Sequence, residues 1–535
     1  MTPDEPRLLR SSATVAVGSL LSRLTGLLRL YATGRAIGTA SWLAGAYSAS
    51  NNVPNIVYEL AVGGVLSASL VPLFVERIDE NDHEGVSVLV SVTIAVLGAV
   101  AVIGILAAPL LGWFLGTGVH GPGSEGYREV MTRLLRWFLP QVYFYGLITL
   151  TSALLQARRR FAAAAFAPAV NNVVATAALL SLPAVVTGDL RGANPLAVAL
   201  AEPKVLTWLG LGTTLGVVAS ALVVLPVLGD RQLRLRFRPN WRHPLVGRLV
   251  RLSGWTVGYV AANQATSVVT ILAANRAPKG AIAAYDYAYI FFIVPHGLLA
   301  VSFMTALTPE LARYALRRDL RGLRREWIDG LRLTALLMLP ASVGLFVLAH
   351  PVVGLLFNRR QDVLLTAGTL RAFAVGLAGF SLYLFALRPF YAQGNLRVPF
   401  RLNLVENAIQ IVLTVVLGIA FGATGLGLAH SIAYLLAAVL AFSATARSLG
   451  RVPVSSVRPV RGMAVSAVLM GLVVAAALSV VRWAANSLGY GFAPLAEVLA
   501  GVAVGVPVYV AFLRAFGSAA DLEPILRRAR ALLRR

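Results

Sequence analysis

Apolar residues recur in long runs along the whole chain, and short segments rich in charged or turn-forming residues separate these runs. Most runs have about 20 residues or more, the length that an α-helix needs to cross roughly 30 Å of hydrocarbon. Because a bilayer offers no water to backbone groups, each run is expected to form a helix. The pattern predicts about fourteen transmembrane helices, at residues 11–33, 40–73, 86–116, 131–156, 161–187, 204–228, 247–275, 281–313, 329–357, 363–392, 399–421, 424–446, 462–484 and 490–516.

The second and eighth runs are longer than a bilayer requires, and each contains a proline. Proline removes a helical hydrogen bond, so Pro54 and Pro295 predict kinks. Gly63 and Gly64 follow Pro54 and would permit a bend and close approach of another backbone. We therefore expect hinge motion at these four residues.

The composition also places most of the surface in lipid. Only 13% of the 535 residues are charged and 58% are hydrophobic, which is too apolar for a large soluble protein. The net charge of +24 lies in arginine clusters between apolar runs, which indicates topology signals and contacts with anionic lipids rather than a nucleic-acid-binding domain. The chain has no cysteine, which excludes disulfides and thiolate chemistry.

The distribution of arginine between loops predicts the orientation. Basic residues concentrate at 158–160, 231–248, 313–325 and 447–461 and in the C-terminal tail, all on one side of the predicted helices. By the positive-inside rule this side is cytoplasmic, so both termini are expected in the cytoplasm. Arg23 and Arg29 interrupt the first apolar run, so we interpret it as a retained helix rather than a cleavable signal.

Two parts of the chain are similar to each other at a separation of about 240 residues. The segment from Val53 to Pro72 resembles the segment from Val294 to Pro309, and a second pair of segments recurs at a similar offset. A repeat of six helices keeps its orientation, so the two halves should be related by an axis along the membrane normal. The predicted domains are an N-terminal lobe (1–230), a C-terminal lobe (231–447) and two additional helices with a basic tail (448–535).

Two arginines at membrane depth are the first candidates for a binding site. A buried arginine costs several kcal/mol unless it meets water or a partner. One interpretation is that Arg23 and Arg29 line a cavity and bind an anionic group, since a guanidinium matches phosphate oxygens bidentately. The alternative is a structural role, such as pairing with Glu59 or lying near the membrane interface.

Further polar residues accompany them in the predicted membrane helices. The second helix carries candidate substrate-binding residues, namely Asn51, Asn52, Asn55, Tyr58 and Glu59. Amides that simply tie helices together are the alternative. Asp286, Asn403 and Glu406 are candidates for ion coupling, with an interfacial acid or an ion pair as alternatives. We find no nucleotide-binding or hydrolase motif, so we predict no catalytic residue, bound metal or cofactor.

Several motifs resemble one known family. The stretch from Ser22 to Arg29, with Val53-Pro54-Asn55 and the segment from Gly63 to Pro72, resembles the N-terminal signature of the MurJ/MviN lipid II flippases. The sequence following Pro54, PNIVYEL, looks most like actinobacterial members. Arg23 and Arg29 match the family's cavity arginines. The chain has Gly45, Tyr58, Ile290 and Ile293 where many relatives carry charged residues.

This resemblance implies a two-lobed exporter fold of the multidrug/oligosaccharidyl-lipid/polysaccharide superfamily in a bacterial plasma membrane. The implied function is to move a polyprenyl-pyrophosphate-linked peptidoglycan precursor, lipid II, to the outer leaflet by alternating access, without enzymatic activity. Its partners would be this precursor, membrane lipids and cell-wall synthesis or division proteins. The alternatives are an exporter of another lipid-linked oligosaccharide, a drug/cation antiporter and a non-transporting cell-wall scaffold.

Overall fold

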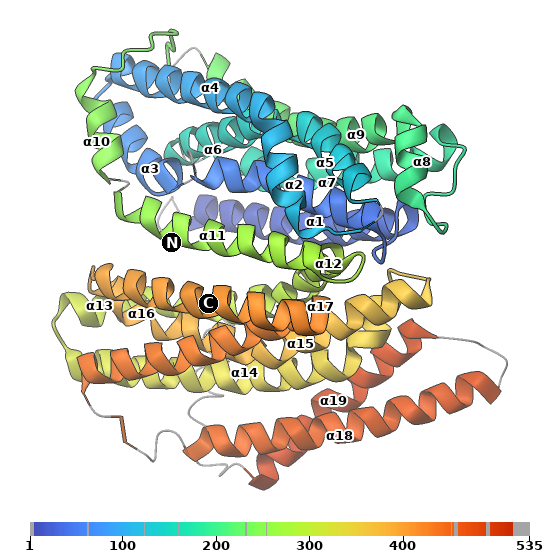
Figure 1. Cartoon of the computed structure of the whole chain (residues 1–535). Helices are drawn as coiled ribbons and strands as arrows, with labels where there is room; N and C mark the ends of the chain where they lie inside the picture. The colour runs from blue at the N-terminus through green and yellow to red at the C-terminus, as the bar shows by residue number, and fades with distance from the viewer. Residues whose placement is uncertain are drawn as a thin grey trace. The chain divides into compact units, whose positions relative to one another are not determined.

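Helices make up every regular element in the part of the chain that the structure describes. This computed structural model describes residues 5–60, 64–121, 123–158, 160–230, 233–252, 254–450, 452–453, 458–487 and 493–516. Contacts divide the chain into two compact units, Met1–Ala283 and Ala284–Arg535. Each unit is a bundle of long helices (Figure 1).

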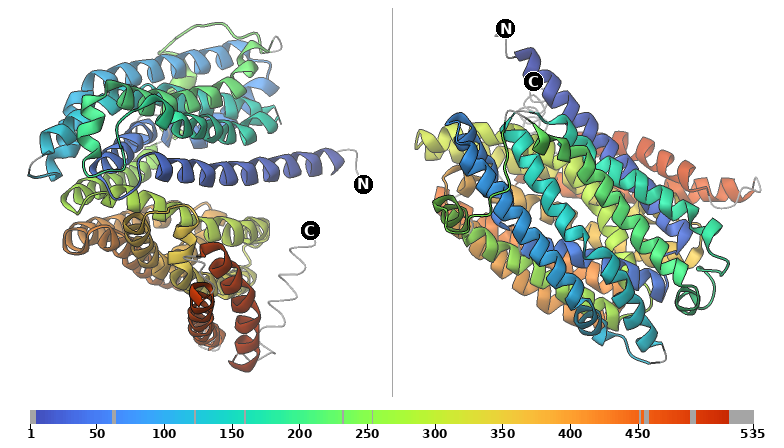
Figure 2. Two further views of the ribbon diagram at one scale, coloured as in Figure 1. Left: turned by 90° about the vertical axis from the view of Figure 1, so that its right-hand side faces the viewer. Right: turned by 90° about the horizontal axis from the view of Figure 1, so that it is seen from above.

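The first unit contains the helices before residue 284. They are α1 (Glu5–Ala36), α2 (Trp42–Tyr58), α3 (Gly64–Asp79), α4 (His83–Leu115), α5 (Ser124–Phe138), α6 (Gln141–Ala157), α7 (Ala162–Val185), α8 (Pro195–Ala201), α9 (Pro203–Val224), α10 (Pro244–Leu252) and α11 (Gly254–Arg276), with two short 3-10 turns, η2 (Gly116–Gly118) and η3 (Leu225–Gly229). Figure 2 shows α1 as one unbroken helix.

The second unit begins within α12 and contains the remaining helices. They are α12 (Ala281–Pro295), the π-helical segment η4 (His296–Ala300), α13 (Val301–Leu316), α14 (Leu320–Gly354), α15 (Arg360–Ala386), α16 (Arg388–Ala392), α17 (Arg397–Leu449), α18 (Arg458–Ser487) and α19 (Pro494–Phe516). The last two, α18 and α19, pack side by side (Figures 1 and 2).

The predicted all-helical membrane architecture is confirmed. The described residues include 11 helices that are long and apolar enough to cross a membrane. One of these, α17, covers two predicted spans on either side of Gly422, where the backbone leaves helical geometry at φ 60° and ψ −138°. The helix α1 covers the first predicted run, and α2 and α3 together cover the second. With these two runs and the two halves of α17, each of the fourteen predicted helices has a counterpart.

Side-chain caps and small residues explain where these helices begin and how closely they pack. Asp82 and Asp319 accept hydrogen bonds from backbone amides at the starts of α4 and α14, at 2.8 and 2.9 Å. Where α15 meets α17, a Cβ on Gly376 would lie 2.5 Å from the Cα of Ser431. Only glycine therefore allows this approach, as expected for helices that associate without water.

The structure adds detail that the hydrophobic pattern did not predict. The short helix α8 begins at Pro195 and is capped by Asn194, and the predicted seventh span begins within a separate short helix, α10, and continues in α11. The fourth predicted run divides near Pro140 into α5 and α6. The contacts group α10 and α11 with the first unit. The lobes predicted at 1–230 and 231–447 and the appendage at 448–535 remain predictions.

Candidate functional site

Arg23 and Arg29 lie half-buried on α1, which packs along α7 in the first unit. At 3.6 residues per turn the two side chains leave the helix about 120° apart, so they do not share one face. Neither guanidinium forms an ion pair with another described residue. A charge at membrane depth without a carboxylate partner must be compensated by water or by a bound anion.

The helix α7 fixes the rotation of α1. The Nδ2 of Asn172 donates to the backbone oxygen of Ser22 at 3.1 Å and lies 3.4 Å from the Oγ1 of Thr25. Arg29 comes seven residues after Ser22, which is about two helical turns, so it leaves α1 on the side that faces α7. Close packing reinforces this arrangement, because a Cβ on Gly18 would lie 2.7 Å from the Cβ of Ala165.

The opposite side of α1 is apolar and exposed. Leu20, Leu24 and Leu28 are 54%, 56% and 47% exposed and form one stripe at helical spacing. This stripe lies on the side of the helix away from Asn172. Consequently α1 directs Arg29 toward α7 and its apolar stripe away from α7.

Hydrogen-bonded side chains connect α2, α6 and α9 close to Arg29. The hydroxyl of Tyr145 donates to Oε1 of Gln141 at 3.2 Å, and Gln141 Nε2 donates to the Oγ1 of Thr214 at 2.8 Å. Tyr58 lies at the same place, with its hydroxyl 2.7 Å from Thr149 Oγ1 and its ring 6.1 Å from that of Tyr145. Arg29 is close enough to Tyr145 for an electrostatic interaction with its hydroxyl. We call the other five side chains, Tyr58, Gln141, Tyr145, Thr149 and Thr214, the tyrosine–amide network.

The polar residues of α2 divide between the interior and the surface. Asn51 and Asn52 are half-buried, whereas Asn55 is exposed. The Oδ1 of Asn51 is buried and accepts no hydrogen bond from the described residues. Glu59 is half-buried directly after α2, next to Tyr58. Tyr58 is thus part of the tyrosine–amide network near Arg29, whereas Asn55 lies at the surface.

Of the residues predicted as hinges, Pro295 lies directly at a break in helix geometry and Pro54 lies five residues before one. Pro54 is inside α2, and residues 59–60, just beyond that helix, have π-helical hydrogen bonding. Pro295 ends α12 and is followed directly by the π-helical segment η4. Gly64 begins α3, whereas Gly63 lies outside the described residues.

The three candidates for ion coupling belong to the second unit. Glu406 is 1% exposed, and its Oε2 accepts a hydrogen bond from Asn407 Nδ2 at 3.0 Å. Asn403, one turn earlier on α17, is buried as well. Tyr285 interacts electrostatically with both Asp286 and Glu406, which places the two carboxyl groups in one region.

An aromatic cluster around His430 was not predicted. Its ring centroid lies 5.1 Å from that of Phe373 and 4.6 Å from that of Tyr434, and Tyr289, Phe292 and Phe380 complete the surroundings. Neither imidazole nitrogen has a hydrogen-bond partner among the described residues. The cluster packs α12, α15 and α17 together.

Comparison with known proteins gives one consistent family. A family model described as "Lipid II flippase MurJ" matches residues 35–494. Two curated relatives are a probable lipid II flippase MurJ of Vibrio cholerae, 27% identical over 80% of this chain and 81% of the relative, and a lipid II flippase MurJ of Burkholderia cenocepacia, 29% identical over 74% and 75%.

Solved structures show the same fold. The structure titled lipid II flippase MurJ in an inward closed conformation aligns with a TM-score of 0.75 and 19% identity, over 96% of this chain and 99% of that chain. An inward-facing multidrug resistance MATE transporter of the MOP superfamily aligns with a TM-score of 0.66 and 12% identity, over 82% of this chain and 98% of that chain.

Proposed function

Since this chain belongs to the lipid II flippase MurJ family, we propose that it moves lipid II from the inner to the outer leaflet of a bacterial plasma membrane. The observation that carries this proposal is the family match, which extends over residues 35–494. The transported molecule would be a peptidoglycan precursor linked to a polyprenyl chain through pyrophosphate. Its charged, sugar-bearing head must cross hydrocarbon while its tail remains in lipid, and alternating access between two lobes meets both requirements.

We assign the recognition of the pyrophosphate to Arg29, with Arg23 in support. Both are half-buried on a membrane helix and form no ion pair with a described carboxylate. A guanidinium can contact phosphate oxygens with two parallel hydrogen bonds. The half-buried members of the tyrosine–amide network near Arg29, Tyr145 and Thr149, carry hydroxyl groups suited to a sugar or a phosphate ester. Asn51, Asn52, Asn55 and Glu59 remain candidate substrate contacts.

Movement between inward-open and outward-open states is assigned to the breaks near Pro54 and Pro295. A π-helical turn lacks the regular hydrogen bonding of an α-helix, and such turns often occur at functional sites. The segments on either side can therefore tilt with less loss of backbone hydrogen bonding than an intact helix would suffer. Gly63 and Gly64 would add freedom between α2 and α3.

The membrane potential can drive this transport without a nucleotide. With the cytoplasm negative, outward movement of an anionic head gains about 2.3 kcal/mol per charge per 100 mV. Coupling to Na⁺ or H⁺ is the alternative, and Asp286, Asn403 and Glu406 are its candidate residues.

The basic loops favour cytoplasmic termini. We also expect cell-wall synthesis or division proteins to bind this chain.

The three rival functions make different demands on the site. An exporter of another lipid-linked oligosaccharide would use the same arginines on a different sugar. A drug/cation antiporter would need a carboxylate rather than arginines as its main binding group. A cell-wall scaffold would need no binding site at all.

Depletion of the protein in its native host tests the proposal. A flippase predicts accumulation of lipid II on the inner leaflet, measured as precursor that an externally added enzyme cannot modify. Purified protein in vesicles should then expose labelled lipid II to the same enzyme. Unchanged translocation with mislocalised synthesis proteins would favour the scaffold, and accumulation of a different lipid-linked glycan would identify another exporter.

A further inference from the structure

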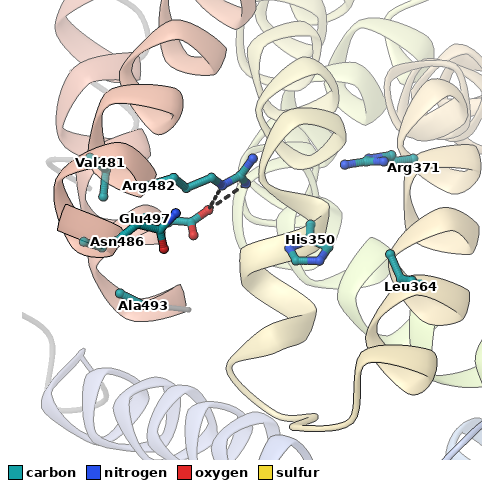
Figure 3. Close-up of a pocket in the computed structure, with 9 residues that line it drawn as sticks. His350, Leu364, Arg371, Val481, Arg482, Asn486, Ala493 and Glu497 are labelled. Atoms are coloured by element: carbon teal, nitrogen blue, oxygen red, sulfur yellow. Dashed lines mark hydrogen bonds and ion pairs between the residues drawn. The ribbon is translucent and has the colours of Figure 1, made fainter. Parts of the chain in front are cut away.

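The helices α14, α15, α18 and α19 line an open cavity of about 440 Å³ within the second unit. Its polar lining consists of His350, Arg371, Arg482, Asn486 and Glu497, and small or aliphatic side chains complete the wall. Figure 3 shows the guanidinium groups of Arg371 and Arg482 directed toward the same space beside the imidazole of His350. The cavity therefore combines a cationic centre with an apolar wall.

The charges in this cavity are not balanced. Glu497 is buried, and its Oε2 accepts a hydrogen bond from Arg482 Nε at 2.8 Å and forms an ion pair with Arg482 Nη2 at 2.7 Å. Arg371, in contrast, is exposed to the cavity and forms no ion pair with a described residue. One carboxylate thus faces two guanidinium groups, which leaves a net positive charge of at least one.

Three of the four helices contribute residues near their ends, whereas Arg371 lies about three turns into α15 and reaches the cavity with its long side chain. Arg482 is near the end of α18, Glu497 is in the first turn of α19 and His350 is close to the end of α14. The neighbouring Trp483 is 73% exposed, and exposed tryptophans are typical of the headgroup level of a bilayer. These ends are opposite the basic loops at 313–325 and 447–461.

An exposed apolar face of α15 adjoins the cavity. Leu364 and Val375 are 52% and 46% exposed, and at seven and four residues from Arg371 they lie on the same side of α15 as its guanidinium. An amphiphile with its phosphate in the cavity could lay its acyl chains along this face. A free ion in solution would make no use of it.

From this combination we propose that the cavity binds the phosphate of an anionic phospholipid in the leaflet opposite the basic loops. Arg371 holds the phosphate, and Arg482 exchanges part of its ion pair with Glu497 for the lipid. The bound lipid would link α18 and α19 to α14 and α15. This site is independent of the recognition of the transported precursor and does not rest on the proposed function.

Quenching of Trp483 fluorescence tests the proposal directly. The full-length protein is placed in phosphatidylcholine nanodiscs containing brominated phosphatidylglycerol, or brominated phosphatidylcholine as the neutral comparison. The signal of the Trp483→Phe variant is subtracted so that only this tryptophan reports. We expect stronger quenching by phosphatidylglycerol, whereas equal quenching by the two lipids would overturn the proposal.

Three substitutions separate the role of the charges from a structural effect. Arg371→Gln should reduce the preference for phosphatidylglycerol about fivefold, the effect of one arginine near a lipid headgroup. Glu497→Gln should increase it, because Arg482 is then available to the phosphate. Arg360→Gln removes an exposed arginine at the start of α15 that does not line the cavity, and should change nothing.

Equal effects of Arg371→Gln and Arg360→Gln would overturn the assignment of the phosphate to Arg371. A lower preference in Glu497→Gln would overturn the proposed competition between Glu497 and the lipid. If Arg371→Gln fails to fold, Arg371→Lys can replace it. This variant retains the positive charge but not the two parallel donors of a guanidinium, so its preference for phosphatidylglycerol should be intermediate. Finally, inorganic phosphate should not abolish the preference; if it does, the ligand is a free phosphate and the lipid assignment is wrong.

Discussion

Replacement of Arg29 by alanine is the sharpest test of the proposed substrate site. The side chain is half-buried on the face of α1 that contacts Asn172 of α7, and it lies close to Tyr145. Because no described carboxylate pairs with it, the substitution leaves no opposite charge behind. Removing an uncompensated cation from membrane depth should leave the stability of the protein unchanged or slightly higher.

The loss of transport should nevertheless be large. A hydrogen bond to a charged group contributes about 1.5–3 kcal/mol, and each 1.4 kcal/mol corresponds to a factor of ten. If the hydrogen bond from Arg29 to the pyrophosphate stabilises the lipid II headgroup while it crosses the membrane, Arg29→Ala should slow flipping roughly 10- to 150-fold. Arg29→Lys should recover only part of this, because an ammonium cannot make the bidentate contact.

Complementation of a flippase-depleted strain and flipping in vesicles measure the effect, with membrane levels determined in parallel. Arg35→Ala is the matched control, since Arg35 is an exposed arginine in the last turn of the same helix. It should support growth normally. Full complementation by the double variant Arg23→Ala/Arg29→Ala at normal membrane levels would refute the assignment. Loss of the protein from the membrane would instead indicate a structural role, as expected if an unseen partner had been left unpaired.

Three further predictions concern the packing and charge of the first unit. Gly18→Ala should destabilise the protein by about 1–3 kcal/mol, since its Cβ would meet Ala165 at 2.7 Å; a lower melting temperature checks this. Asn172→Ala should cost about 0.6–1.7 kcal/mol in the same assay, the range for hydrogen bonds between membrane helices. Glu76, beyond the membrane portion of α3, has its pKa lowered by hydrogen bonds from Arg248 and Arg77. Its contribution to stability is therefore present at neutral pH and lost as the pH falls through that lowered pKa, and Glu76→Gln should abolish this pH dependence of hydrogen exchange in α10.

The membrane-spanning helices could be predicted because lipid imposes one dominant rule. Every helix must present about 20 apolar residues to hydrocarbon, so hydropathy alone locates α4, α7 and α9 closely. Hydropathy does not locate helices that do not cross the membrane. The helix α8 has 7 residues, and its signal, an asparagine cap followed by Pro195, is local chemistry rather than hydropathy.

Only part of the candidate site was visible in the sequence. Arg23 and Arg29 stood out because charge is rare in an apolar run. Their different directions follow from helical spacing, whereas the contact of Asn172 with Ser22 joins residues 150 positions apart and depends on the packing of α7 against α1. The cavity around Arg371 was hidden for the same reason, because four separate helices supply its lining.

The two proline breaks connect the repeat in the sequence to the proposed motion. Proline alone bends a helix but does not require a π-turn, since the missing hydrogen bond affects only the preceding turn. In this chain both Pro54 and Pro295 are followed by π-helical residues, at 59–60 and at His296–Ala300. The π-helical residues begin five residues after the proline in the first part and directly after it in the second, so the two irregularities are of the same kind but are shifted relative to each other. A π-turn within six residues after each proline supplies both parts with a segment that bends at little cost in hydrogen bonds, and this is the property that the proposed alternating access requires of a hinge.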